Sequence, residues 1–339
     1  MKREEGITFD NFNYQRGLFA TLSGYFVNHQ IGGSKKGLEN KMKQTEKFRS
    51  GYVTIIGEPN VGKSTLLNAI LGEKLAIVTP KPQTTRNRIT GILTTDNYQI
   101  IFLDTPGILR PKYRLQEHLI KAAFAAADDA DVILYMIDVK NLPPPEFGIL
   151  ERIKKSGGTL ILVINKIDLI PKTTLLPLIS SYSQKFDFQE IIPISATQGD
   201  GVSDLLDLIV KYIPYGPAYY PEDQLSDLPE RFFVAETIRE KVFLKTKQEI
   251  PYASCVLVDE FKERERGKIY IHATIYVERN SQKGIIIGKG GRTLKEIGQL
   301  AREEIETLLQ APVFLNIRVK VKENWRKNER DLKELGYGI

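Results

Sequence analysis

The chain has 339 residues, which is enough for two domains of ordinary size. Its hydrophobic fraction of 42% and charged fraction of 27% are typical of globular proteins and exclude a largely disordered chain. The apolar runs are too short for membrane-spanning helices, and the single cysteine excludes an intrachain disulfide and a cysteine-based metal site. The first 30 residues lack the apolar core of a secretory signal, so we expect a cytoplasmic protein.

The N-terminal segment, residues 1–50, shows no sustained helical or strand period, and we predict a flexible extension there. From residue 51 to residue 215, short apolar runs alternate with helix-like segments. The strands are expected at Tyr52–Ile56, Gln99–Leu103, Val132–Ile137, Thr159–Ile164 and Ile191–Ile194, and helices at Lys63–Leu71, Leu115–Ala127 and Asp204–Tyr212. Continuously apolar strands are buried on both faces, so we predict an α/β domain with a mostly parallel, doubly wound sheet.

The last third of the chain has a different order of elements. Residues 216–229 are rich in proline, tyrosine and acidic residues and are predicted to be a linker. Residues 230–339 contain expected helices at Arg231–Lys247 and Leu294–Leu309, and expected strands at Ser254–Phe261, Lys268–Val277 and Val313–Val321. Because the last two strands alternate apolar and polar residues, we predict a small α+β domain with helices on one face of a sheet.

The segment Gly57–Ser64 fits the pattern G-x-x-x-x-G-K-[ST] and lies between a predicted strand and a predicted helix. In such a loop, backbone amides cradle phosphates, Lys63 reaches the β- and γ-phosphates, and Ser64 binds Mg²⁺. Asn60 is either a ligand for a monovalent cation such as K⁺ or a residue that caps the loop. The nucleotide-binding residues expected in this loop are Gly57, Glu58, Pro59, Asn60, Val61, Gly62, Lys63, Ser64 and Thr65.

Three further motifs follow predicted strands in chain order. Asp104-Thr105-Pro106-Gly107 is expected to hold Mg²⁺ through Asp104 and to offer the Gly107 amide to the γ-phosphate. In the segment Asn165-Lys166-Ile167-Asp168, the last carboxylate can accept from two guanine N–H groups that adenine does not offer. Ser195-Ala196 places a backbone N–H at the guanine oxygen. Together with the phosphate loop, these motifs predict a GTP-binding domain.

The polar segment Pro82–Arg88 lies between the first two motifs and is suited to a switch loop. We expect Thr85 to complete the Mg²⁺ shell, with Thr84 as the alternative residue. The non-functional alternative is that the segment is an ordinary surface loop. The predicted catalytic groups are Lys63, Thr85 and Gly107. Ile108 stands where many small GTPases carry a water-orienting glutamine, so we expect slow intrinsic hydrolysis.

The segment Ile285–Gly291 contains a G-x-x-G loop ahead of a predicted helix, within a run from Arg279 to Lys295 that has five basic and no acidic residues. Such a loop lets a helix N-terminus approach a nucleic-acid backbone, and the alternative is a structural turn. The RNA-binding residues predicted here are Lys283, Ile286, Ile287, Gly288, Lys289, Gly290, Gly291, Arg292 and Lys295.

From residue 51 to about residue 330, the order of these motifs resembles the Era family of bacterial GTPases, in which a GTPase domain precedes one KH domain. The resemblance implies GTP, GDP and Mg²⁺ as ligands and a role in assembly of the small ribosomal subunit. It also implies binding of single-stranded RNA through the KH domain, at the 3′ region of the small-subunit (16S) rRNA, and peripheral association with the inner membrane. We expect a monomer. Members of the family begin closer to the first strand, so Met42 is an alternative start.

Two other functions are compatible with parts of the sequence. A non-hydrolysing assembly scaffold would use GTP as a structural ligand only, and Ile108 is the residue that favours it. A membrane-remodelling or filament-forming GTPase would need a long coiled coil or a strongly amphipathic basic helix, and the sequence shows neither.

Overall fold

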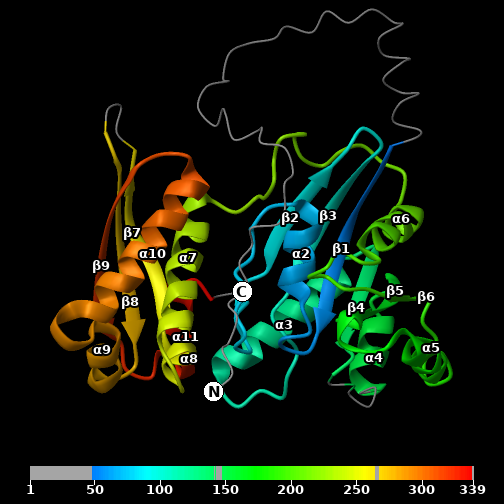
Figure 1. The fold of residues 1–339 in the computed structure, drawn as a ribbon, viewed down its shortest axis with the longest axis horizontal. Helices are drawn as coiled ribbons and strands as arrows, with labels where there is room; N and C mark the ends of the chain where they lie inside the picture. The colour runs from blue at the N-terminus through cyan, green and yellow to red at the C-terminus, as the bar shows by residue number, and fades with distance from the viewer. Residues whose placement is uncertain (1–47, 141, 143–146, 264–266, 338–339) are drawn as a thin grey trace, which may run out of the picture.

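The computed structural model describes residues 48–140, 142, 147–263 and 267–337 (Figure 1). Most of the predicted extension and the alternative start at Met42 therefore lie outside the described residues. The boundary at residue 50 is too late, because the first strand, β1 (Arg49–Gly57), already includes Arg49 and Ser50. Arg49 pairs with Tyr98 in the neighbouring strand, and its backbone forms an isolated bridge with Tyr215.

The first half of the chain forms a six-stranded sheet in the order β2-β3-β1-β4-β5-β6. All neighbouring pairs are parallel except β2 and β3, so the predicted mostly parallel, doubly wound sheet is confirmed. The sequence did not reveal β2, an antiparallel edge strand. The remaining strands are β2 (Ile89–Thr94), β3 (Tyr98–Asp104), β4 (Val132–Asp138), β5 (Thr159–Asn165) and β6 (Glu190–Pro193).

Helices cover both faces of this sheet. On one face, α2 (Lys63–Leu71) and α6 (Val202–Tyr212) bury their apolar sides against β1, β3, β4 and β5. On the other face, α3 (Arg114–Asp128), α4 (Phe147–Lys154) and α5 (Leu175–Ser183) do the same. With both faces covered, ligand-binding loops are left at the carboxyl edge of the strands, where every predicted nucleotide motif lies.

The second half, from residue 230 onwards, is built on the sheet β7-β8-β9, in which β8 is antiparallel to β7 and parallel to β9. Helices α7, α9 and α10 share a buried apolar core with one face of this sheet. The elements are α7 (Glu230–Lys245), α8 (Ile250–Ala253), β7 (Cys255–Lys262), β8 (Ile269–Val277), α9 (Asn280–Ile287), α10 (Arg292–Leu309), β9 (Val313–Val321) and α11 (Glu329–Glu334). The predicted α+β architecture is therefore confirmed.

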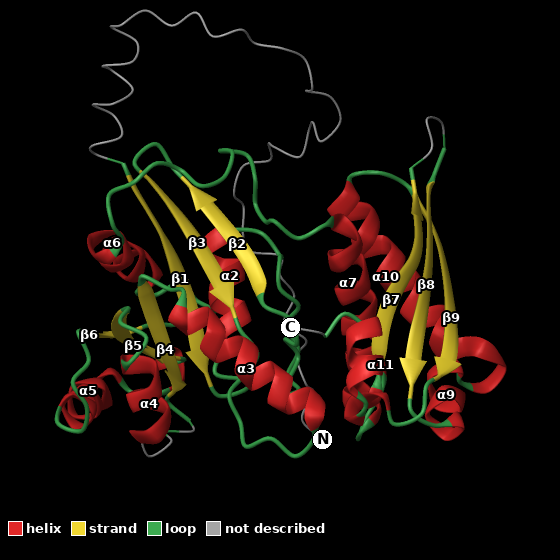
Figure 2. Ribbon diagram, turned by 180° about the vertical axis from the view of Figure 1, so that it is seen from behind, coloured by secondary structure: helices red, strands yellow, loops and turns green. Residues whose placement is uncertain are grey.

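The two halves meet along α7, whose residues Arg239, Glu240 and Phe243 contact the segment between α2 and β2 (Figures 1 and 2). A second point of contact is apolar. Leu115 and Leu119 of α3 pack with Trp325, Leu332 and other buried residues near the C-terminus. Within the described part of the chain, no helix combines the length and the apolar character needed to cross a membrane.

Candidate GTP-binding and RNA-binding sites

The phosphate loop connects β1 to α2, and its backbone is tightly enclosed. Gly62, which precedes the first turn of α2, has φ 106°, a left-handed conformation that favours glycine. A Cβ atom there would lie 2.3 Å from the Nδ2 atom of Asn165, so a side chain cannot be accommodated. Glycine at this position lets the loop fold tightly, with its backbone amides and the N-terminus of α2 available to a ligand.

Lys63 is buried inside this loop. Its Nζ atom donates to the carbonyl oxygens of Gly57 at 3.1 Å and Glu58 at 2.8 Å. Burial lowers the pKa of Lys63 to about 8, against the opposing effect of the nearby Asp104 and Glu58 carboxylates. A phosphate would provide the counter-charge for this desolvated ammonium group.

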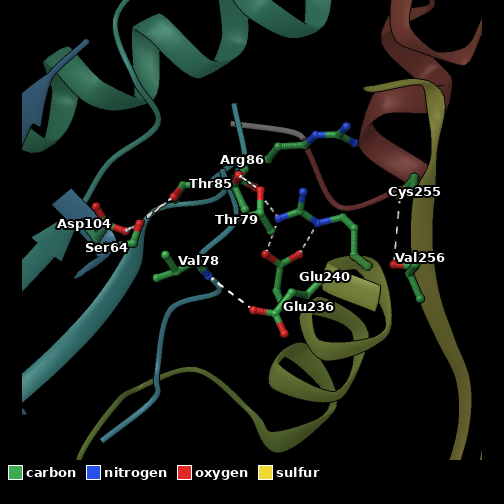
Figure 3. A network of polar contacts seen from close by, with 12 residues as sticks. Ser64, Val78, Thr79, Thr85, Arg86, Asp104, Glu236, Glu240, Cys255 and Val256 are labelled. Carbon is green, nitrogen blue, oxygen red and sulfur yellow. Dashed lines mark hydrogen bonds and ion pairs between the residues drawn. The ribbon is translucent and has the colours of Figure 1, made fainter. Parts of the chain in front are cut away.

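Ser64, Thr85 and Asp104 meet beside the loop, as predicted for a Mg²⁺ site (Figure 3). The Ser64 hydroxyl donates to Asp104 Oδ2 at 2.6 Å and lies 2.9 Å from the Thr85 hydroxyl. The Thr85 hydroxyl also donates to the same carboxylate oxygen at 3.5 Å. The Thr84 hydroxyl is instead 2.8 Å from that of Thr79, so the geometry favours Thr85 over the alternative.

The Asp104 carboxylate is fully buried, and burial raises its pKa to about 6, partly offset by the charge of Lys63. Its Oδ1 atom is buried without a hydrogen-bond partner among the described residues. Two hydroxyls and a carboxylate are hard oxygen donors of the kind that Mg²⁺ prefers, and Mg²⁺ usually completes its shell with water and phosphate oxygens. The donor set therefore fits Mg²⁺. Among the described residues, histidine, cysteine and carboxylate side chains form no group of three or more that suits a metal ion.

The rest of the Asp104-Thr105-Pro106-Gly107 motif is fixed against the phosphate loop. The Thr105 hydroxyl donates to the Ile55 carbonyl at 2.8 Å. A Cβ atom on Gly107 would lie 2.7 Å from the nitrogen of Pro59, so this glycine is required for the close approach. The Ile108 side chain is buried in the apolar core beneath the sheet. It cannot orient a water molecule.

The predicted guanine-binding motifs are joined by Asn165 at the end of β5. Its Nδ2 atom donates to the Val61 carbonyl at 2.8 Å, and its Oδ1 atom accepts from the Ala196 amide at 2.9 Å. The Ser195 hydroxyl donates to Asp168 Oδ1 at 2.6 Å, which orients that exposed carboxylate. The sequence predicted that these motifs lie at one site. It did not predict that Asn165 links them by hydrogen bonds.

A further contact holds Lys166, which has φ 65°. Its Nζ atom donates to the Asn60 carbonyl at 2.7 Å and to Asp138 Oδ2 at 2.5 Å. The sequence reasoning missed Asp138, although its position at the end of the buried strand β4 was a usable signal. The Asn60 side chain donates to the Pro80 carbonyl at 3.1 Å, which is a loop contact, and its role toward K⁺ stays a prediction.

The predicted RNA-binding loop links α9 to α10. Gly288, Gly290 and Gly291 have φ of 73°, 61° and 78°, and the neighbouring Lys289 is exposed. Exposed Arg292 and Lys295 follow on the first turn of α10, and Lys283 on α9 is half-buried.

One residue of α9 in the predicted RNA site has its side chain in the core. Ile286 is 0% exposed and packs in the core, because it lies on the face of α9 that is turned toward the sheet. Ile287 is half-buried against the same core. Ile285 is 53% exposed and is the most exposed apolar side chain of this run.

Comparison with known proteins agrees with both halves. Residues 52–166 match the family described as 50S ribosome-binding GTPase, and residues 249–326 match the KH domain. The chain is 53% identical over 293 residues to GTPase Era of Geobacter sp. (strain M21), which covers 86% of this chain and 99% of that protein. The chain belongs to the GTPase Era family. It is also 48% identical over 294 residues to GTPase Era of Lactobacillus helveticus (strain DPC 4571), covering 87% of this chain and 98% of that protein.

Two solved Era structures are similar over the same extent. One is Era in complex with MgGDPNP and nucleotides 1506–1542 of 16S ribosomal RNA, with a TM-score of 0.83 and 43% identity over 86% of this chain and all of that one. The other is an Aquifex aeolicus Era variant bound to GDP and AlF4⁻, with a TM-score of 0.83, 42% identity and the same coverage. The family resemblance, the fold class and the assignment as a GTPase are therefore confirmed.

Proposed function

We propose that this Era family member is a GTP-hydrolysing molecular switch that binds the 3′ region of 16S rRNA and acts in assembly and maturation of the small ribosomal subunit. The observation that carries the nucleotide half is the cluster of Ser64, Thr85 and Asp104 beside the phosphate loop. The RNA half is supported by the exposed glycine loop with Lys289 and Arg292, and by the similar Era structure that contains nucleotides 1506–1542 of 16S rRNA.

The family description names the 50S subunit for residues 52–166 alone, whereas the Era structure with 16S rRNA is similar over 86% of the chain. The broader match also includes the KH domain, which is the part suited to single-stranded RNA. We therefore favour the small subunit.

In this proposal, each side chain has a defined task. Lys63 neutralises the β- and γ-phosphates, and the Gly107 amide contacts the γ-phosphate. Ser64 and Thr85 would ligate Mg²⁺ directly, with Asp104 acting through water; the bound ion would stabilise the charge that develops on the transferred phosphoryl group. With Ile108 buried in the core, the chain offers no glutamine at that position, so hydrolysis should be slow without RNA or another activator.

Single-turnover hydrolysis of GTP with Mg²⁺, measured with and without RNA corresponding to nucleotides 1506–1542, tests the proposal. We expect slow turnover that Lys63→Ala abolishes, and RNA binding that Lys63→Ala leaves intact. Gly290→Asp should give the opposite result, with normal hydrolysis in the absence of RNA and weakened RNA binding. Absence of turnover under all conditions would favour the non-hydrolysing scaffold.

Several finer assignments belong to the same proposal. Peripheral membrane association predicts co-flotation with vesicles that contain anionic phospholipid, and a K⁺ ion near Asn60 predicts faster hydrolysis in KCl than in NaCl. The monomer predicts a mass of one chain in solution. A linker at residues 216–229, between the GTPase half and residues 230–339, predicts that limited proteolysis cuts within this linker. A protein that does not float with the vesicles would remove the membrane assignment. Equal hydrolysis rates in KCl and NaCl would remove the K⁺ ion, and a mass of two chains would remove the monomer.

A further inference from the structure

The segment Pro82–Arg88, called here the switch segment, lies against the KH half of the molecule (Figure 3). The Thr84 carbonyl oxygen accepts a hydrogen bond from Nη2 of Arg239, a residue of α7. Two residues later, the guanidinium group of Arg86 donates to the carbonyl oxygens of Ser254 at 2.7 Å, Pro251 at 3.0 Å and Tyr252 at 3.1 Å.

Arg239 is held rigidly before it reaches the switch segment. Its Nε atom donates to Glu236 Oε1 at 2.8 Å, its Nη2 atom donates to the other oxygen of the same carboxylate, and its side chain is 1% exposed. The guanidinium also lies 5.3 Å from the ring centre of Phe243. A planar guanidinium with two bonds to one carboxylate has little freedom left, so the direction in which Nη2 points is set by α7.

The atom that Arg239 contacts belongs to the peptide group between Thr84 and Thr85. A peptide group is planar, and in its trans form the carbonyl oxygen and the following N–H point in opposite directions. When Arg239 holds the Thr84 oxygen toward the KH half, the Thr85 N–H must point away from that half. The Thr85 hydroxyl lies 2.9 Å from that of Ser64, at the proposed Mg²⁺ site.

We propose that Arg239 is a positioning residue of the GTP site, supplied by the RNA-binding half, which fixes the Thr84–Thr85 peptide and so presents Thr85 to Mg²⁺ and the γ-phosphate. The proposal rests on the function of Thr85 proposed above. It implies that the GTPase half does not complete its nucleotide site alone.

The competing interpretation is that Glu236 and Arg239 are only a buried ion pair that stabilises α7. Replacing Arg239 alone would leave the buried Glu236 charge without its partner and could unfold the KH half. The test therefore uses Glu236→Gln together with Arg239→Met, which removes both charges and keeps similar volumes. Arg231→Met is the matched control, because Arg231 is an exposed arginine near the start of the same helix.

The measured quantity is the Mg²⁺ concentration needed to slow the dissociation of a fluorescent, non-hydrolysable GTP analogue from the full chain. We expect the double variant to need about tenfold more Mg²⁺, since a hydrogen bond from a charged group is lost. Arg231→Met should need the same concentration as the natural chain. Binding of RNA and the thermal midpoint of the KH half should change little in either variant.

Combination with Thr85→Ala separates positioning from simple stability. If Arg239 acts through Thr85, the double variant should have a much smaller additional effect on the Mg²⁺ requirement when Thr85 is already alanine, because the hydroxyl ligand is then absent and only the backbone N–H remains to be positioned. An equal additional effect in that background would overturn the proposal, as would an unchanged Mg²⁺ requirement in the double variant. If Thr85→Ala alone left the Mg²⁺ requirement unchanged, the proposed Mg²⁺ role of Thr85 would be refuted. This outcome differs from the two that would refute the positioning role of Arg239.

Trp325 provides a control for the packing of the two halves. It is the single tryptophan of the chain, is fully buried, and has the Arg86 guanidinium 6.0 Å from its ring centre. We expect its emission to be the same in the double variant as in the natural chain. A red shift would mean that the pair holds the halves together, which would overturn the positioning role.

Discussion

Asp168 is the side chain on which selection of guanine should depend, and Asp168→Asn is the most direct test of the base site. In the structure, Asp168 Oδ1 accepts from Ser195 at 2.6 Å, which turns the carboxylate in a fixed direction. Guanine offers two N–H groups to such a carboxylate. An asparagine amide presents one oxygen and one NH₂ group instead. One of the two bonds is therefore lost, and the asparagine NH₂ group faces a guanine N–H group, so that two donors meet.

The magnitude follows from the charge and the exposure of this carboxylate. Each hydrogen bond to a charged group contributes about 1.5–3 kcal/mol. Asp168 is exposed in the absence of a base, so part of that gain is offset when the carboxylate loses water, and we adopt the lower figure. The two bonds to the charged carboxylate together contribute about 3 kcal/mol. Asp168→Asn breaks one of them and removes the charge from the other, so GTP affinity should fall by up to roughly a hundredfold.

Equilibrium titration with fluorescent GTP and xanthosine triphosphate measures this change. The asparagine variant should bind xanthosine triphosphate more tightly than GTP, because the C2 carbonyl of xanthine accepts from the new NH₂ group. Ser195→Ala is the matched control; it removes the orienting hydroxyl and should weaken GTP binding only about fivefold without changing the preference, as expected for the loss of about 1 kcal/mol. Unchanged GTP affinity in Asp168→Asn would refute this assignment of the base site.

Three other substitutions give contrasting outcomes. Ile108→Ala should cost about 2–5 kcal/mol of stability in thermal unfolding yet preserve single-turnover hydrolysis, whereas Lys63→Ala should abolish hydrolysis; equal loss in both would contradict the proposed site. Gly290→Asp adds a negative charge and a side chain at a left-handed position, so RNA affinity should fall about tenfold or more with a flatter salt dependence, measured at two salt concentrations, while GTP affinity stays the same. Ile286→Ala should lower the unfolding free energy by about 2–5 kcal/mol, whereas Ile285→Ala should leave it nearly unchanged and weaken RNA binding; the reverse order would show that α9 is turned the other way.

The sequence was sufficient for the parts of the fold that rest on local patterns. Strands such as Val132–Asp138 are continuously apolar because both of their faces are covered, and this pattern is visible without a structure. The phosphate-loop helix Lys63–Leu71 and the strand Val313–Val321 have the bounds that periodicity and glycine positions predict. Because parallel strands share a carboxyl edge, the order of the nucleotide motifs also placed them at one site.

The features that the sequence did not reveal depend on contacts between distant segments. Ile89–Thr94 contains a glycine and two threonines, and it becomes a strand because β3 offers it an antiparallel edge. The run Ile285–Ile287 is apolar at every position, so its period does not show that Ile286 faces inward. Nothing in the local sequence of Arg239 indicates that it reaches Thr84, which is 155 residues earlier in the chain.

The contact between Arg239 and Thr84 also sets an order of events during synthesis of the chain. At about 5–20 residues per second, the ribosome needs roughly 8–31 seconds to add the 155 residues that separate the two partners. The carbonyl partner of Arg86 at Ser254 is made still later, 168 residues after the arginine. A nascent GTPase half therefore emerges with its switch segment not yet anchored. We expect its Mg²⁺-dependent affinity for GTP to reach the final value only when the RNA-binding half has folded against it.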